Sequence, residues 1–380
     1  MTPGTMLAAV SHEGESHFRL ERVPVPELGD GDVLVRVEGA SINSSTLLRW
    51  RELPWYHRLP AIIGIHAAGT VAARGRHAFG TAVGDRVHVD PTLPCGRCDA
   101  CLSDNGVSCR EGVVVIGSDP GEGASAAARE RYAHYSSGCF AEYWRVPATA
   151  INRVPDHVPF PVAAGLGLLG VSYHALTAAR PPRDATIVLT GATGGNGAAV
   201  VRQAPLLGVG RVLAVGRSAE RLKALRELAP EIVEPLVLEP GWERDDGLTR
   251  AIRERTAGKG ADALLDFLPS GHAITAQALF GLRTGSRAVL YGGDGTEQLA
   301  FDYVRAMPVS QYRLLGERGH GRRDMLEILG HLEARRLDPA PLVTHRFPLE
   351  AINDAVDLLD AHRAGADVTK WFVTIEPAAP

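Results

Sequence analysis

The chain has 380 residues, of which 45 % are hydrophobic, so it can bury two cores of ordinary size. Its 40 Lys and Arg residues are balanced by 44 Asp and Glu residues, which leaves no excess positive charge for a nucleic acid backbone, and we expect no nucleic acid partner. Neither a secretory leader nor a run of roughly eighteen apolar residues occurs, so we expect a cytoplasmic protein with no membrane partner.

Short alternating segments separated by Gly and Pro turns dominate the first 160 residues. Val33–Val37 and Asp85–Val89 alternate in the way that half-buried strands do, which predicts a β-rich domain. The small-residue run Gly121–Ala128 is expected to be a loop.

Beyond residue 161, fully apolar strands alternate with helical patterns, which indicates a parallel sheet covered on both faces and therefore an α/β protein. The expected strands are Thr186–Leu189, Arg211–Val215, Ala263–Phe267 and Ala288–Tyr291, with Gln311–Gly316 as one more. Amphipathic helices are expected over Arg323–Ala334 and Leu349–Leu359. The strand Trp371–Ile375 is then expected to return to the first domain.

A glycine-rich turn follows the strand Thr186–Leu189 and leads into a helix that begins at Ala198. Glycines let the backbone approach a pyrophosphate, whose charge is stabilised by the free N–H groups at a helix N-terminus. Because strand, turn, helix and next strand occur in this order, the segment predicts a dinucleotide site. Its residues are Thr190, Gly191, Ala192, Thr193, Gly194, Gly195, Asn196 and Gly197.

The next strand ends in Gly216, Arg217 and Ser218. An NAD-selective site usually offers a carboxylate to the ribose at this point, whereas Arg217 can form a charge-assisted fork to a 2′-phosphate and Ser218 can donate a second hydrogen bond. The placement favours NADP(H), with a solvated surface arginine as the alternative. The other positions expected to contact the cofactor are Arg221, Leu268, Tyr291 and Gly292.

Four cysteines crowd into one short segment: Cys95, Cys98, Cys101 and Cys109. Four thiolates fill the tetrahedral coordination of zinc and leave no position for a substrate, so the spacing predicts one structural zinc per chain. Cys139 stands apart and is expected to be a buried core thiol.

Together these features resemble the medium-chain dehydrogenase/reductase superfamily, which includes zinc alcohol dehydrogenases and quinone or enoyl reductases. Further matching segments are Pro60–Gly64, Gly69–Val71, Gly84–Val87, Phe140–Tyr143 and His345–Leu349. The resemblance implies a GroES-like domain of residues 1–160 and 317–380, a Rossmann NADP-binding domain of residues 161–316, and an active site between them. It also implies a homodimer formed through the edge of the Rossmann sheet.

The positions where zinc-using members hold a catalytic metal differ in this chain. They correspond to Asn43, Ile65 and Leu168. Isoleucine and leucine have no donor atom for a metal, so we expect no catalytic zinc. An asparagine at the first position resembles the zinc-free quinone and enoyl reductases.

These observations favour an NADPH-dependent reductase that transfers hydride to an activated C=C bond of a small molecule, of enone, enoyl or quinone type. One alternative is a zinc-independent alcohol or ketone oxidoreductase of a specialised metabolite, which would use the same cofactor. A second alternative is a catalytically silent NADP-binding protein.

Without a metal, the developing enolate needs hydrogen-bond donors and a proton source. Asn43 is a candidate donor or a turn cap, and Ser45 occupies the family's hydroxyl relay position or is structural. Tyr56 lies near the place where zinc-free enoyl reductases carry a proton-donating tyrosine, with a pocket-lining aromatic as the alternative. His66 could act as the acid or be held by a backbone carbonyl.

Trp50, Trp55 and Tyr56 gather aromatic surface near the expected substrate cleft, which predicts a bulky or planar apolar substrate. The segment Gly117–Ser137 lengthens the link between the cysteines and Phe140. It either covers the cleft or forms a solvated flap.

Overall fold

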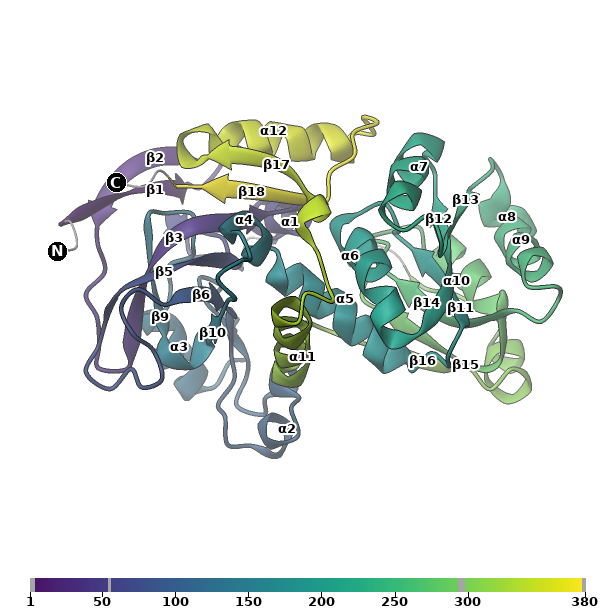
Figure 1. Ribbon diagram of the computed structural model, residues 1–380, viewed down its shortest axis with the longest axis horizontal. Coiled ribbons are helices and arrows are strands. Elements are labelled where there is room, and N and C mark those ends of the chain that lie inside the picture. The colour runs from purple at the N-terminus through teal and green to yellow at the C-terminus, as the bar shows by residue number, and fades with distance from the viewer. Residues whose placement is uncertain (1–3, 54–55, 293–297, 378–380) are drawn as a thin grey trace.

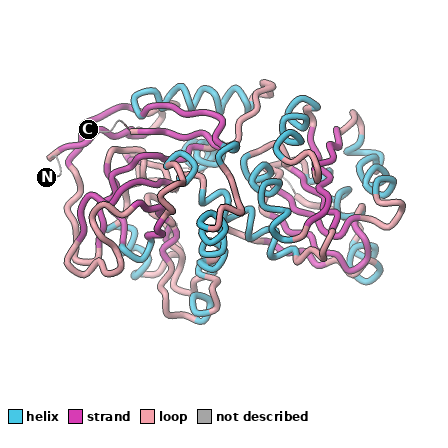
Figure 2. The backbone as a smooth tube through the Cα atoms, viewed as in Figure 1, coloured by secondary structure: helices cyan, strands magenta, loops and turns pink. Residues whose placement is uncertain are grey.

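Antiparallel strands from both ends of the chain build the first domain (Figures 1 and 2). The computed structural model describes residues 4–53, 56–292 and 298–377. In its main sheet the order is β10-β6-β5-β3-β18-β17, and β9 also pairs with β3. These strands are β3 (Asp32–Ile42), β5 (Ala67–Arg74), β6 (Arg86–Val89), β9 (Tyr143–Pro147), β10 (Ile151–Arg153), β17 (Val343–Pro348) and β18 (Phe372–Glu376). A second sheet has the order β2-β1-β4, from β1 (Thr5–Ser11), β2 (Arg19–Pro24) and β4 (Ala61–Ile62).

The antiparallel pairing of β18 with β3 brings the end of the chain into the first domain, with Val373 opposite Ile42. The return of the last strand is therefore confirmed. The core beneath these sheets contains Val33, Val35 and Trp144, each nearly or fully buried. Helices that cover it are α1 (Ser44–Glu52), α3 (Ala126–His134), α4 (Phe160–Ala163) and α12 (Ile352–Arg363).

The second domain is a parallel sheet with the order β13-β12-β11-β14-β15-β16. This is the 3-2-1-4-5-6 order of a Rossmann domain, so the predicted fold class is confirmed. Its strands are β11 (Ala185–Thr190), β12 (Val209–Gly216), β13 (Val233–Val237), β14 (Ala261–Asp266), β15 (Leu282–Leu290) and β16 (Arg313–Gly316). Its helices are α6 (Gly195–Gln203), α7 (Ala219–Leu228), α8 (Trp242–Asp245), α9 (Gly247–Arg255) and α10 (His272–Phe280).

Both faces of this sheet are buried, as its uninterrupted apolar strands require. In β11, Ile187 and Leu189 join one hydrophobic cluster while Val188 joins the cluster on the other face. Figure 2 shows helices on both sides of the strands. Two more helices, α5 (Leu166–Ala179) and α11 (Arg322–Glu333), run between the domains in Figure 1.

Several local predictions were wrong. Ala126–Ala128 begin α3 rather than continue the expected loop, because the Ser125 hydroxyl caps the helix and alanines favour it. Trp50 does not line a cleft: it is 4 % exposed and its ring stacks on Phe18 at 4.3 Å. Trp55 lies outside the described residues.

The segment Gly117–Ser137 is largely packed on the first domain. The buried carboxylate of Asp32 accepts hydrogen bonds from His134 at 2.8 Å and from the Tyr135 hydroxyl at 2.7 Å. At the other end of the segment, the Gly117 carbonyl accepts from the His57 ring at 2.9 Å. The helix α3 is thus held to the β-rich core, while the first residues of the segment support the end of the loop after α1.

The edge of the parallel sheet is formed by β16, and the exposed residues Tyr303, Val304 and Val309 precede it in the chain. The homodimer through this edge stays a prediction. Among the described residues, the helices are all too short or too polar to cross a bilayer.

Candidate functional site

The glycine-rich turn lies where β11 meets α6. Gly191 has a φ of +66°, and a Cβ there would lie 2.7 Å from the carbonyl carbon of Phe267. A Cβ at Gly197 would lie 2.2 Å from the Ala192 carbonyl oxygen, so the helix can pack this closely only without a side chain. The N-cap residue is Gly194, which has no side chain to satisfy the first N–H groups, and these are suited to a pyrophosphate.

The ends of β14 and β15 meet beside this turn. A Cβ at Gly292 would lie 1.9 Å from the Leu268 carbonyl oxygen, so the two backbones touch. The Tyr291 ring stacks on Phe267, and its hydroxyl donates to the Gly319 carbonyl at 2.8 Å. The predicted cofactor positions on these strands therefore lie together at the carboxyl edge of the sheet.

Thr190 serves the sheet instead of facing a ligand. It is fully buried, and its hydroxyl donates to the carboxylate of Asp266 on the neighbouring strand. The hydroxyl of Thr275 donates to the same carboxylate at 3.1 Å. Burial raises the pKa of Asp266, and these donors oppose that rise.

A lysine that the sequence analysis missed lies beside the phosphate-binding turn. A Cβ at Gly195 would lie 2.8 Å from the Trp371 carbonyl oxygen, so the C-terminal segment crosses the start of α6. The preceding residue, Lys370, is buried and its ammonium donates to the Ser44 hydroxyl at 2.7 Å. Burial lowers the pKa of Lys370 to about 8, and the nearby cations Arg221 and Arg363 add to this.

The end of β12 carries the predicted adenosine-side residues. Ser218 caps α7, and its hydroxyl donates to the Asp367 carboxylate at 2.6 Å. The guanidinium of Arg221 lies 3.3 Å from the same carboxylate. Arg217 is exposed, and no hydrogen bond or ion pair engages it within the described ranges.

The four cysteines converge as predicted, and their sulfur atoms all lie within 4.8 Å of one another. Cys98 and Cys101 are 3.4 Å apart, and Cys95 and Cys101 are 3.8 Å apart. Tetrahedral zinc with Zn–S bonds of about 2.3 Å places its sulfurs about 3.8 Å apart, so this donor set fits the metal. The Cys95 N–H donates to the Cys109 sulfur at 3.3 Å.

Two of the candidate catalytic residues, Asn43 and Ser45, lie at the start of α1, and Tyr56 follows the end of this helix. Asn43 is its N-cap: its Oδ1 accepts from the Thr46 N–H at 3.1 Å and from the Ser45 hydroxyl at 2.6 Å. In the described residues, the Asn43 amide nitrogen has no hydrogen-bond partner. Asn43 therefore caps a helix through its oxygen and can still donate through its nitrogen, while Ser45 supports that cap.

His66 lies against α5 on the opposite side. A Cβ at Gly167 would lie 2.3 Å from its Nδ1, and this enclosed nitrogen has no partner within the described chain. Burial lowers the pKa of His66 to about 3, with Arg49 and His320 adding to the effect. The ring is therefore neutral and is not a cationic acid. Cys139 is fully buried nearby, and its thiol faces the His66 carbonyl.

Comparison with known proteins agrees with this geometry. The family model "Alcohol dehydrogenase GroES-like domain" matches residues 29–156. L-threonine 3-dehydrogenase of Symbiobacterium thermophilum is 30 % identical over 371 residues, which cover 95 % of this chain and 96 % of the relative. The corresponding protein of Bacillus subtilis is 25 % identical over 376 residues, covering 96 % and 98 %. The chain belongs to the medium-chain dehydrogenase/reductase superfamily.

Solved structures of the superfamily have the same fold. The crystal structure of AibC superposes with a TM-score of 0.83 at 25 % identity and covers 99 % of this chain and 97 % of its own. Alcohol dehydrogenase TADH from Thermus sp. ATN1 has a TM-score of 0.81 at 23 % identity, covers 98 % and 100 %, and supports the fold alone. As a superfamily member the protein is an oxidoreductase, with sites suited to a nicotinamide cofactor and to structural zinc.

The structure brings the superfamily's three metal-ligand positions together. The Ser41 N–H, just before Asn43, donates to the His66 carbonyl at 2.8 Å, and His66 in turn contacts Gly167. The residues at these meeting points are Asn43, Ile65 and Leu168, and they do not supply a set of metal ligands. The donor set at this centre does not fit a catalytic zinc held in the superfamily's usual way.

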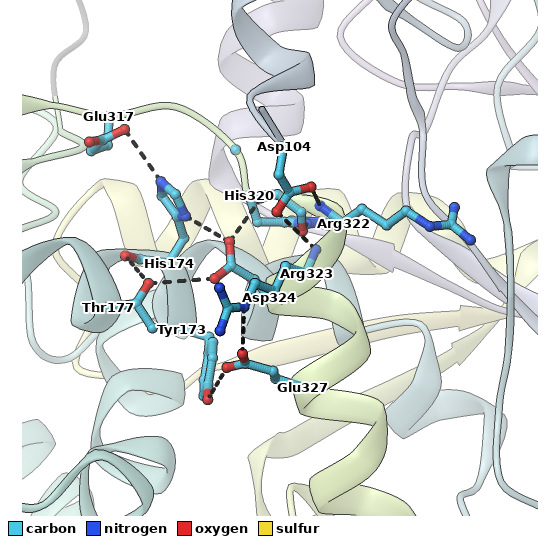
Figure 3. A network of polar contacts seen from close by, with 12 residues as sticks. Asp104, Tyr173, His174, Thr177, Glu317, His320, Arg322, Arg323, Asp324 and Glu327 are labelled. Atoms are coloured by element: carbon cyan, nitrogen blue, oxygen red, sulfur yellow. Dashed lines mark hydrogen bonds and ion pairs between the residues drawn. The ribbon is translucent and has the colours of Figure 1, made fainter. Parts of the chain in front are cut away.

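The segment of the four cysteines, Cys95–Cys109, contacts the start of α11 through Asp104 (Figure 3). The carboxylate of Asp104 accepts hydrogen bonds from the backbone N–H groups of Arg322 at 2.9 Å and Arg323 at 3.1 Å. In the same first turn of the helix, Asp324 accepts a hydrogen bond from the His174 ring of α5 at 2.7 Å. Zinc binding, the cap of α11 and the contact of α11 with α5 thus form one connected unit.

We expect metal analysis of the purified protein to find one zinc per chain, with Cys101→Ser losing it because three thiolates hold zinc weakly. The loss should also lower the melting temperature, since Asp104 would no longer cap α11. Cys139→Ser, whose residue lies apart from the cluster, should retain the metal. Two zinc ions per wild-type chain would contradict the absence of a catalytic metal.

The His174–Asp324 contact predicts a pH-dependent contribution to stability. Its side chains are 27 % and 12 % exposed. The hydrogen bond to Asp324 raises the pKa of His174 above its ordinary 6.5, while donors including His174 hold the pKa of Asp324 below its ordinary 3.8 despite burial. The His174 contribution is complete below pH 6.5 and is lost as pH rises through its raised pKa. The Asp324 contribution is present above pH 3.8 and is lost as pH falls through its lowered pKa.

His174→Asn should therefore cost about 1–2 kcal/mol of unfolding free energy near pH 5–6, and less as the pH rises above neutrality. Urea unfolding of both proteins across this range measures the difference. A difference that does not vary with pH would show that the charge of His174 plays no part.

Proposed function

We propose that this protein is an NADPH-dependent reductase that works without catalytic zinc and delivers hydride to an activated C=C bond. The proposal rests on the residues at the expected metal-ligand positions. Ile65 and Leu168 offer no donor atom, and the oxygen of Asn43 is used as a helix cap. Alcohol oxidation through a zinc alkoxide needs the Lewis acid that these residues do not hold.

NADP(H) preference is supported by the residues at the end of β12. Arg217 is exposed and, among the described residues, unpaired, so its guanidinium can turn to a 2′-phosphate without breaking an ion pair. Ser218 and Arg221 both bind the Asp367 carboxylate, which lies where a 2′-phosphate would be expected. A phosphate bound there would exchange with that carboxylate, since both are anions that fit the same donors.

NADPH bound at the glycine turn would supply a hydride to the β-carbon of the substrate. The amide N–H of Asn43 would then donate to the substrate carbonyl oxygen, where negative charge develops. Tyr56 is the proposed proton source, through its hydroxyl. Burial keeps the His66 ring neutral, so this ring would offer the site a hydrogen-bonding group without a charge. Trp50 lies in the core and Trp55 lies outside the described residues. Of the three aromatic side chains expected near the cleft, Tyr56 is therefore the one left to contact a bulky apolar substrate.

A second candidate is the zinc-independent reduction of a ketone or oxidation of an alcohol. It is favoured by the curated relatives, which are named L-threonine 3-dehydrogenase and so act on a carbon that bears oxygen. The same Asn43 donor would then bind the oxygen of the reacting C=O bond. The two candidates differ in the carbon that receives hydride.

Arg217→Ala should weaken NADPH binding by about 10- to 100-fold, because it removes a charge-assisted hydrogen bond to the 2′-phosphate. Asp367→Asn should strengthen NADPH binding, since it removes a competing carboxylate. Neither change should alter NADH affinity much. Fluorescence titration with both cofactors measures this, and equal losses for NADH and NADPH in Arg217→Ala would rule out the phosphate role.

NADPH deuterated at C4 distinguishes the candidate reactions when it is offered with a panel of enones, quinones, enoyl thioesters and ketones. We expect the label at the β-carbon of the reduced product. A label at a carbinol carbon would instead establish the second candidate. NADPH binding without turnover of any probe would indicate a catalytically silent protein.

Asn43→Asp is the matched variant for this experiment. Aspartate caps helices as well as asparagine does, so α1 should remain intact. The substitution removes the amide donor, so kcat should fall about 100-fold with little change in melting temperature. An unchanged kcat would exclude Asn43 from stabilising the enolate.

A further inference from the structure

Arg49 is a partly buried cation in α1 that forms no ion pair with any described residue. Its guanidinium lies over the Tyr56 ring, 5.4 Å from the ring centroid, and no carboxylate in the described part of the chain comes within ion-pair distance of it. Arg51 of the same helix, by contrast, pairs with Asp360 at 2.8 Å. A half-buried cation is costly unless an anion joins it, so Arg49 is prepared for an anionic partner.

Two histidines lie within electrostatic range of Arg49. The charged or titratable neighbours that act on the His66 ring are Arg49 and His320, and Arg49 acts likewise on His57. His88 is fully buried next to His66 and His320, with neither ring nitrogen hydrogen-bonded within the described residues. Arg49 therefore adds a positive charge near His57 and His66, whose imidazoles burial keeps neutral.

The position of Arg49 separates it from the cofactor phosphates. The first turn of α1 meets Lys370 through Ser44, beside the glycine turn. Arg49 lies five residues further on, about 7–8 Å along the helix axis, and contacts the Tyr56 ring. The first turn of α1 thus lies near the cofactor site, and Arg49 lies near Tyr56, the proposed proton source.

We propose that Arg49 binds a carboxylate of the substrate. The substrate that the enzyme reduces would then be the anion of an unsaturated oxo acid. The inference rests on the proposed reductase function and narrows its substrate class. The cation–π contact with the Tyr56 ring uses no N–H group, so the guanidinium can still bind the two oxygens of a carboxylate. The neutral imidazoles of His57 and His66 do not compete for Arg49 as an anion would.

The test uses (E)-4-oxopent-2-enoate and its methyl ester, which share one enone and differ in charge. The wild-type enzyme with NADPH should favour the acid by about 10- to 100-fold in kcat/KM. Arg49→Gln should abolish this preference by weakening use of the acid, and Arg49→Lys should retain part of it. Arg51→Gln, in the same helix but paired with Asp360, should keep the wild-type preference.

Binding is measured separately with 4-oxopentanoate and its methyl ester, which have no C=C bond, titrated into the enzyme–NADP⁺ complex by calorimetry. Acid-selective binding that depends on Arg49, without turnover of either enone, would support carboxylate recognition while the C=C function fails. Equal use and equal binding of acid and ester would overturn carboxylate recognition and leave the reductase intact. A loss of NADPH affinity in Arg49→Gln as large as the loss for the acid would also overturn it, because Arg49 would then serve the cofactor.

Discussion

The two domains meet on one face of α5, and that contact depends on glycines. A Cβ at Gly167 would collide with the His66 ring, and a Cβ at Gly170 would lie 2.4 Å from His320. Because these positions are three residues apart, they form a single notch on the helix surface. Side chains from the β-rich domain and from the loop before α11 can therefore approach the same helix closely.

Helix α1 carries polar groups that serve both the cofactor side and the substrate side of the proposed reaction. Its first turn faces the phosphate-binding side through Ser44 and Lys370, and its cap residue Asn43 retains an amide donor. Further along, the Arg49 cation lies over the Tyr56 ring. Hydride transfer to a conjugated carbonyl compound needs an oxyanion donor and correct orientation more than it needs a metal. The aliphatic residues at the former ligand positions are consistent with that requirement.

Local patterns predicted the parts of the site that lie within one stretch of chain. The glycine turn and the four cysteines depend on short spacings, and both converge as expected. Lys370, Asp367 and Asp104 could not be found in this way, since each acts on an element distant in sequence. The edge strand β13 was also missed: Pro235 interrupts its pattern, and proline is tolerated there only because the strand lies at an edge. Trp50 was misplaced because composition cannot distinguish a core ring from a pocket ring.

The pairing of β18 with β3 also governs the order in which the molecule can be assembled. A nascent chain leaves the ribosome from its N-terminus, and domains fold as units when their residues have emerged. The Rossmann sheet is continuous in sequence and can close while translation is still under way. The β-rich domain must wait for Phe372–Glu376, so the Ala40–Ile42 end of β3 lacks its partner strand until those residues have been made, although β9 can already pair with Asp32–Arg36. Until then, that short strand edge is open, and chaperones can shield it from aggregation.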